Sequence, residues 1–244
     1  PLEAPLAAAR ASDLQVVATI GPVHSLVAAV MAPGKPVLLY SGAASPHTAT
    51  LRPSQVRALK AAILIVRIGA GYETALAKPL RSMALRLKVL TLSKADGVTR
   101  LPRRGGGAGA KKGTDPHIWL DPRNAAAMVH AIAEALATRD PLNALVYLTR
   151  AERTATKLKQ LERNIAARLG GRPTTFVAGH DAFQYFETRY GLKAVGALVG
   201  PDGSRIGARG ARRLRHQAKT AKVGCVLDDG PKPSRLARSL AGDL

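Results

Sequence analysis

Short apolar runs alternate along this chain with stretches of helical spacing, and this alternation limits the folds that the chain can adopt. Runs suited to buried strands lie at 13–20, 36–40, 62–68, 88–92, 174–178, 192–199 and 223–227. Helical stretches separate most neighbouring runs, and proline or aspartate stands at several helix starts. Strands linked by helices in this way form right-handed βαβ units with parallel sheets. The sequence therefore predicts an α/β fold with parallel sheets flanked by helices.

Three histidines stand at predicted junctions between a strand and the following helix. His47 follows the run at 36–40, His117 directly precedes an Asp-Pro helix start, and His180 follows the run at 174–178. Because open α/β folds bind ligands at the carboxyl ends of their strands, we expect the three side chains to converge. Three neutral imidazoles with a fourth position open are a known arrangement for Zn²⁺. The sequence therefore predicts a zinc site made by His47, His117 and His180.

Three motifs around these histidines resemble a known family. They read SPHxxxLRPS from Ser45, DPHIWLDP from Asp115 and HDAFxYFxxRYGL from His180. In this order they are similar to the motifs of the zinc-binding receptors of bacterial ABC importers, the ZnuA type of the metal-binding solute-receptor family. The resemblance implies that each motif supplies one metal-ligating histidine. It also implies high-affinity binding of Zn²⁺ and delivery of the ion to an ABC permease.

The resemblance extends from about Val16 to the C-terminus and implies a domain organisation. Receptors of this family have two α/β lobes joined by one long rigid helix, and the longest helical pattern here lies at 140–170, before a Gly-Gly pair. We expect an N-terminal lobe at 13–139 and a C-terminal lobe at 171–244. The family has a further strand beyond the point where this sequence stops, so the C-terminal lobe is expected to be incomplete.

The choice of metal and the fourth ligand are the open points of the predicted site. Manganese and iron receptors of the same family carry glutamate at the third place, so His180 favours zinc, with a manganese or iron receptor as the alternative. The fourth ligand is water, Asp228 or Asp229, or it is missing. Carboxylates close to the histidines in sequence, such as Asp115, are expected to orient the imidazole rings.

Residues 101–113 form a glycine-rich basic segment in the middle of the chain. The segment lacks the Gly-Lys-Ser/Thr ending of a phosphate-binding loop, so we interpret it as a flexible surface linker. The resembled zinc receptors often carry a histidine-rich acidic loop at this place. This segment contains no histidine, which argues against a metal-gathering role for it.

The chain is strongly basic, with 37 Lys and Arg against 16 Asp and Glu and a net charge of +21. Such an excess attracts anionic partners, including nucleic acids. The strongest basic stretch runs from Gly203 to Leu227 and contains neither an acidic nor an aromatic residue. Because base stacking needs aromatic side chains, we expect a solvated basic face and no nucleic-acid partner. A basic nucleic-acid-binding protein stays as the alternative, since the resemblance does not account for the charge.

The sequence also bears on the cellular location of the protein and on whether it is an enzyme. No apolar run is long enough to span a bilayer. Residues 1–12 fit the end of a signal peptide, although a plain alanine-rich leader fits as well. The resemblance implies the periplasm. A zinc hydrolase with Asp181 or Asp228 as general base is the alternative chemistry, but no substrate-pocket motif supports it, so we expect a receptor and not an enzyme.

Overall fold

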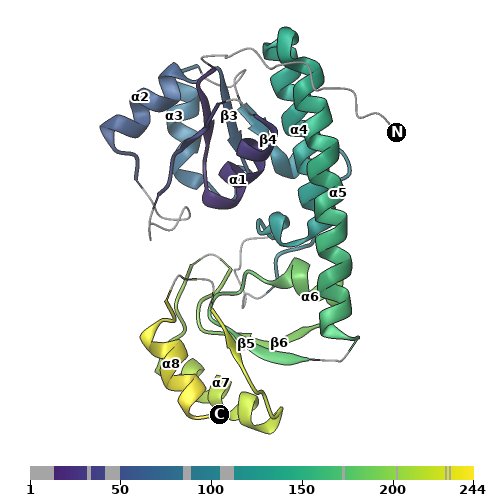
Figure 1. Cartoon of the computed structure of the whole chain (residues 1–244). Coiled ribbons are helices and arrows are strands. Elements are labelled where there is room, and N and C mark those ends of the chain that lie inside the picture. The colour runs from purple at the N-terminus through teal and green to yellow at the C-terminus, as the bar shows by residue number, and fades with distance from the viewer. Residues whose placement is uncertain are drawn as a thin grey trace. The chain divides into compact units, whose positions relative to one another are not determined.

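The structure is a computed structural model of the chain (Figure 1). It describes residues 14–31, 34–41, 50–84, 89–104, 113–171, 174–201, 203–228, 230 and 232–244. The chain forms two compact units. Unit 1 comprises residues 1–99 and 122–162, and unit 2 comprises residues 100–121 and 163–244. The expected lobe boundaries at 139 and 171 stay a prediction.

Unit 1 is built on a four-stranded parallel sheet with the order β2-β1-β3-β4. Its strands are β1 (Val16–Ala18), β2 (Val37–Leu38), β3 (Leu64–Arg67) and β4 (Val89–Thr91). Val16, Val17 and Ala18 of the inner strand β1 are all buried, as are Leu64 and Ile65 of β3. Continuous apolar runs of this kind are typical of strands that are covered on both faces of a parallel sheet.

The helices of unit 1 follow the strands in the expected alternation. They are α1 (Gly21–Val30), α2 (Pro53–Ala61), α3 (Ala77–Ser82) and α4 (Pro122–Arg139), with the short 3₁₀ helices η1 (Thr74–Leu76), η3 (Leu92–Lys94) and η5 (Pro141–Asn143). Proline stands at the start of α1, α2 and α4, where its missing N–H costs no hydrogen bond. Helix α1 packs against both β1 and α4, and Val23 and Val27 of α1 are fully buried.

Unit 2 contains a three-stranded parallel sheet with the order β6-β5-β7. Its elements are the 3₁₀ helix η4 (Ile118–Leu120), β5 (Thr175–Ala178), α6 (Gln184–Tyr190), β6 (Lys193–Ala197), α7 (Ala208–Thr220), β7 (Val226–Leu227) and α8 (Arg235–Gly242). Helix α6 ends at Gly191, which has a φ of 68°, a left-handed conformation that glycine adopts without steric cost. A core cluster formed by α7, α8 and the sheet includes Val177, Leu214 and Leu240.

Helix α5 (Ala144–Leu169) has 26 residues and runs from unit 1 into unit 2 (Figure 1). This confirms the expected long helix between two α/β lobes. The helix stops at Gly170 and Gly171, which both have positive φ. The apolar residues at the start of the helix are only partly buried, since Leu145 is 70% exposed while Val146 and Tyr147 are buried.

The α/β class with parallel sheets is thus confirmed, and most predicted elements are present with shorter bounds. Two local features could not be read from the sequence pattern. Helix α6 begins at Gln184, and Asp181, which follows His180 directly, binds an arginine side chain and does not open the helix. Helix α8 was not predicted, since its eight residues are too few for periodicity to stand out. Within the described residues, no helix combines the length and the apolar character needed to cross a bilayer.

Candidate metal centre

Two of the three predicted histidines lie together in unit 2. The ring centroids of His117 and His180 are 5.0 Å apart, and the ring planes are inclined by 84°. The Nε2 atoms of both rings are buried. The third predicted ligand, His47, lies outside the described residues. Among the residues that the structure does describe, no group of three His, Cys, Asp or Glu side chains is close enough to hold a metal ion. The three-histidine site therefore stays a prediction.

His180 reaches this place because it follows strand β5. The strand ends at Ala178, whose register partner on β7 is Leu227. Gly179 then donates its backbone N–H to the Leu227 carbonyl over 2.7 Å. A Cβ atom on Gly179 would collide with the carboxylate of Asp228, so only glycine fits between the two strand ends. Asp228 therefore lies beside the turn that presents His180, at the same edge of the sheet.

His117 is held by the carboxylate of Asp115. The Oδ1 atom of Asp115 accepts from the backbone N–H of His117 over 2.9 Å and lies 2.7 Å from the ring Nδ1. Both side chains are almost fully buried. When Nδ1–H donates to the carboxylate, the neutral ring carries its lone pair on Nε2. Trp119 packs edge-on against the same ring with a centroid distance of 5.3 Å and further restricts its orientation.

Tyr185 of α6 ties the segment around Asp115 to the rest of unit 2. Its hydroxyl donates to the Asp115 carbonyl over 2.9 Å and accepts from the backbone N–H of Leu101 over 2.9 Å. Burial, with the charge of Asp115 as a smaller cause, raises the pKa of Tyr185 to about 12. The hydroxyl therefore stays protonated at neutral pH and keeps its donor role.

Two arginines bind carboxylates of the second and third histidine motifs. Arg104 binds Asp181 over 2.7 Å and also binds the carboxylate of Glu187, which is buried. Burial alone would lower the pKa of Arg104, but the hydrogen bonds that Arg104 donates to Glu187 and Asp181 raise it above its ordinary value. Arg189 forms a bidentate pair with Asp121 at 3.0 and 2.6 Å. Asp121 of the second motif and Asp181 of the third motif are therefore each paired with an arginine.

The sequence analysis found Asp115 but missed Arg104 and Tyr185. Arg104 lies in the segment at 101–113 that was interpreted as a flexible linker, and this interpretation was wrong for its described flanks. The backbone N–H of Arg103 donates to the carbonyl of Gly113, so both sides of the segment are paired. Tyr185 was visible as the tyrosine of the third motif, but nothing in the sequence shows which backbone groups it binds.

Known proteins share both the sequence pattern and the fold. A family model described as "ZnuA: Zinc-uptake complex component A periplasmic" matches residues 16–244. The high-affinity zinc uptake system protein ZnuA of Brucella abortus is 32% identical over 92% of this chain and 79% of its own length.

Solved structures agree in fold. The laminin-binding adhesin Lmb of Streptococcus agalactiae, in a mutant form, has 26% identity and a TM-score of 0.79 and covers 94% of this chain and 85% of its own. A zinc-bound ZnuA deletion mutant has 24% identity and a TM-score of 0.82 over 94% of this chain and 86% of its own. The resemblance seen in the three histidine motifs is thus confirmed, and the chain belongs to the ZnuA family of periplasmic zinc-uptake components.

Proposed function

We propose that this chain is a periplasmic solute receptor that binds Zn²⁺ with high affinity and delivers it to the permease of an ABC importer. The observation that carries the proposal is the edge-on pair of His117 and His180, with Asp115 bound to Nδ1 of His117. A histidine that donates one ring nitrogen to a carboxylate is the usual form of a zinc-ligating histidine. Family membership supports the same function.

The donor set supports zinc as the transported ion. His117 and His180 supply two imidazoles, and we assign the third to His47, which follows β2 in the sequence. Imidazole suits Zn²⁺, whereas Mn²⁺ prefers carboxylate and water ligands. A manganese or iron receptor is therefore the weaker candidate, although such receptors belong to the same wider family.

Asp228 is our candidate for a carboxylate ligand from unit 2. It lies against Gly179, next to His180, and its Oδ2 accepts from the backbone N–H of Ser234 over 2.9 Å. This hydrogen bond would hold one oxygen of the carboxylate while the other turns toward a metal. Water and Asp229 are the other choices for the fourth position, and Asp229 lies outside the described residues.

Binding without turnover is part of the proposal. A zinc hydrolase needs a carboxylate that is able to take a proton from metal-bound water. Asp181, one candidate for this role, already accepts two N–H groups of Arg104 on its Oδ1 atom, so this oxygen is engaged in a structural ion pair. The family is one of receptors, which supports the same reading. Ester and phosphoester substrates offered with zinc should therefore give no turnover that chelation stops.

The test is the affinity for zinc, measured by competition with a chromophoric chelator at neutral pH. We expect one tightly bound zinc per chain, and a large loss of affinity in each of His47→Ala, His117→Ala and His180→Ala. His216→Ala, on the exposed side of α7, is the matched control and should bind like the parent. Equal affinity in all four variants would reject the site. Tighter binding of Mn²⁺ than of Zn²⁺ would favour the manganese receptor.

The cellular location and the permease partner have their own test. If the protein is a periplasmic receptor, osmotic shock of the producing bacterium should release it together with other periplasmic proteins. Its removal should slow zinc uptake at low external zinc, and added zinc should restore growth. Retention in the cytoplasm would contradict the proposed location.

A further inference from the structure

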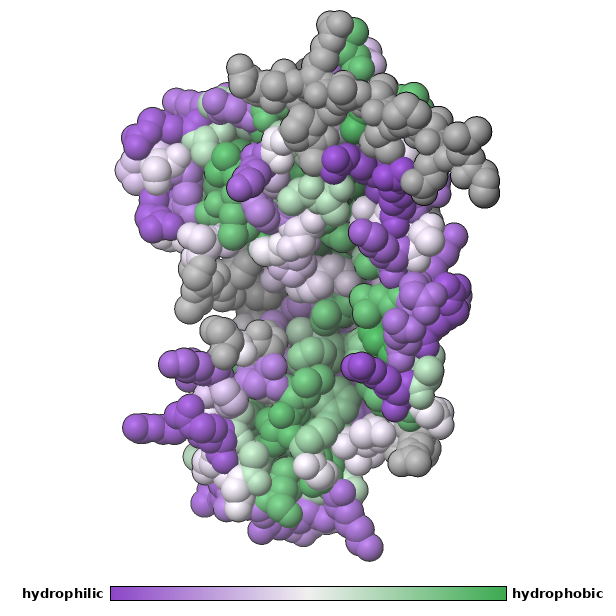
Figure 2. All heavy atoms as spheres, viewed as in Figure 1, coloured by the Kyte–Doolittle hydropathy of each residue, from purple (hydrophilic) through white to green (hydrophobic). Residues whose placement is uncertain are grey.

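One surface of unit 2 is strongly basic. We define the basic face by the exposed residues Arg209, Arg212, Arg213 and Lys219 of α7 with Arg235 and Arg238 of α8. Hydrophilic side chains project from the part of unit 2 formed by α8 (Figure 2). The zinc site and the family motifs do not use any of these residues. The basic face is therefore a feature that the proposed zinc binding leaves unexplained.

The two helices of the basic face are held on the same side of the sheet. Leu214 and Ala218 of α7 belong to one core cluster with Ala237 and Leu240 of α8. Arg215 of α7 also pairs with Asp243, just beyond α8, over 2.7 Å. The apolar side of each helix packs against this shared cluster. The basic residues on the opposite sides of both helices therefore face solvent.

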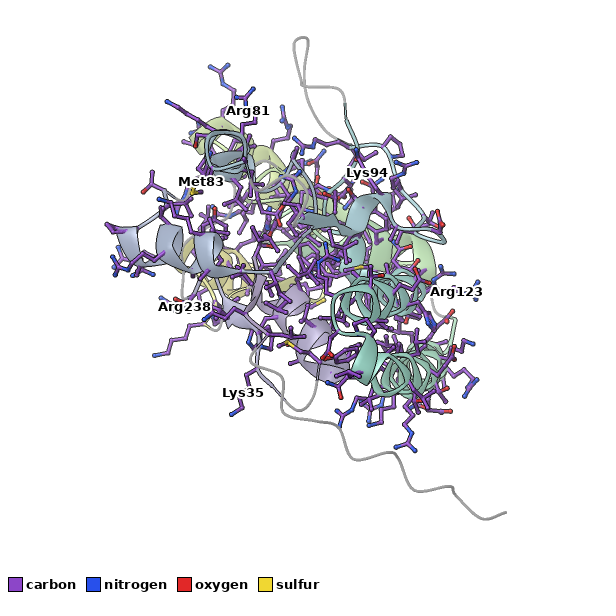
Figure 3. All side chains as sticks on the ribbon, turned by 90° about the horizontal axis from the view of Figure 1, so that it is seen from above. Lys35, Arg81, Met83, Lys94, Arg123 and Arg238 are labelled. Atoms are coloured by element: carbon purple, nitrogen blue, oxygen red, sulfur yellow. The ribbon has the colours of Figure 1, made fainter. Side chains whose placement is uncertain are left out.

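Three basic residues of unit 1 provide a contrast with the basic face. Lys35, Arg81 and Arg123 of unit 1 come from different parts of that unit, and their side chains extend away from the ribbon (Figure 3). Arg123 is also paired with Glu162 over 2.8 Å. In contrast, none of the six residues of the basic face forms an ion pair within the part of the chain that the structure describes.

The charge pattern of α7 works against the stability of the helix unless an anion is present. Arg209 stands three and four residues before Arg212 and Arg213, a spacing at which like charges repel on a helix surface. The first turn of α7 contains no acidic residue, so the positive end of the helix dipole is close to further positive charge. An extended anionic surface would relieve both effects.

We propose that the basic face of unit 2 binds the anionic phospholipid surface of the membrane. This inference rests on the proposed function, because a receptor that delivers zinc to a permease works beside a bilayer. Clustered Lys and Arg residues are attracted to acidic lipid headgroups at such a surface. Leu236 lies between Arg235 and Arg238 and is 41% exposed, so it adds an apolar contact next to the basic residues.

A lipid surface is favoured over nucleic acid on the same face. No Phe, Tyr or Trp occurs after Tyr190, so the basic face has none of the large aromatic rings on which single-stranded bases mainly stack. A bilayer needs only a broad array of positive charge with an apolar neighbour, and α7 and α8 provide both. Preferential binding of nucleic acid to the basic face would therefore contradict the proposal.

The experiment is flotation of the full chain with lipid vesicles at low and at physiological salt. We expect binding to vesicles of phosphatidylcholine with about one third phosphatidylglycerol, no binding to pure phosphatidylcholine, and weakening by salt. The triple variant Arg209→Gln, Arg212→Gln, Arg213→Gln should bind the anionic vesicles at least about tenfold more weakly. Glutamine is chosen because its helix propensity is close to that of arginine.

The matched control removes three exposed positive charges from unit 1 through Arg57→Gln, Lys60→Gln and Lys78→Gln. It should keep vesicle binding within about twofold of the parent, since these residues lie outside the basic face. Equal loss in both triple variants, or no binding by the parent, would overturn the proposal. Tighter binding of the parent to duplex DNA than to anionic vesicles at the same salt would also overturn it.

Zinc affinity is measured on the same three proteins by chelator competition and should not change between them. This readout separates the two proposals. Both proposals are supported if the basic-face variant loses vesicle binding while all three proteins bind zinc tightly. Tight zinc binding without vesicle binding overturns the membrane contact alone, and vesicle binding without zinc binding overturns the zinc receptor on which the inference rests.

Discussion

The Oδ1 atom of Asp115 lies 2.7 Å from Nδ1 of His117, and it also accepts the backbone N–H of His117 over 2.9 Å. One buried oxygen thus fixes both the main chain and the ring of a proposed zinc ligand. A hydrogen bond from Nδ1–H to this carboxylate selects the tautomer with the lone pair on Nε2 and fixes the orientation of the ring. Asp115 is therefore expected to act on zinc binding through His117.

Asp115→Asn should weaken zinc binding by about 10- to 100-fold, because the carboxamide keeps the size of the side chain but loses its charge. Competition with a chromophoric chelator measures the change. Asp96→Asn, at an exposed position of unit 1, is the matched control and should bind zinc like the parent. If Asp115→Asn binds as tightly as the parent while unfolding at the same temperature, Asp115 does not tune the site.

Arg104→Gln should destabilise unit 2. The substitution leaves Glu187, which is only 5% exposed, without its guanidinium partner. Breaking a fully buried ion pair costs about 3–5 kcal/mol and an exposed one at most about 1 kcal/mol. Since Arg104 is itself partly exposed, we expect a loss of about 2 kcal/mol in the free energy of unfolding, measured by urea denaturation.

Arg123→Gln provides the comparison for that experiment. Arg123 also pairs with a glutamate, Glu162, but its side chain is 65% exposed. Water screens such a pair, so its loss should cost less than about 1 kcal/mol. A cost for Arg104→Gln no larger than that for Arg123→Gln would show that the cluster of Arg104, Asp181 and Glu187 adds no special stability.

The fold could be predicted from the sequence because its signals are local. The apolar run at β3 predicts a strand, and the proline at the start of α2 predicts a helix start. Each of these signals spans only a few residues. The contact of Asp115 with His117 could also be predicted, because the two residues are separated by a single proline. The short separation fixes the geometry almost independently of the rest of the chain.

Contacts between distant segments could not be predicted. Arg104 and Glu187 are 83 positions apart, and Tyr185 binds the backbone of Leu101 across 84 positions. The glycine-rich composition around Arg104 indicates a linker, and only the packing of α6 shows that one of its arginines is an ion-pair partner. Likewise, the carboxylate of Glu73 is fully buried beside β1 and β3, and nothing in the residues next to it in the sequence indicates this.

Tyr185→Phe should lower the free energy of unfolding by about 2 kcal/mol, because it leaves the Asp115 carbonyl and the Leu101 N–H without their hydroxyl partner. Tyr40→Phe is the control, since the buried hydroxyl of Tyr40 makes no hydrogen bond with any described residue. It should be neutral or slightly stabilising. Urea denaturation measures the free energy of unfolding of both variants. Equal changes would mean that the hydrogen bonds of the Tyr185 hydroxyl do not stabilise unit 2.

The last prediction concerns the pH dependence of stability that Glu73 causes. Its carboxylate accepts from Thr19 Oγ1 over 2.7 Å and from the backbone N–H groups of Ile68 and Gly69 over 2.9 Å each. Burial nevertheless dominates and raises the pKa of Glu73 above its ordinary value of 4.5. The folded state therefore binds this proton more tightly than the unfolded state does, and it loses that advantage as the pH rises.

The stabilisation from protonated Glu73 is complete below the unfolded pKa and disappears as the pH rises through the raised folded value. Glu73→Gln removes the titration. The unfolding free energy of the parent minus that of Glu73→Gln should therefore fall with rising pH, by at most about 1.4 kcal/mol per pH unit. The same comparison with Glu134→Gln, an exposed position of α4, should lack this trend. A difference that stays constant or rises with pH would show that the three hydrogen bonds to Glu73 outweigh its burial.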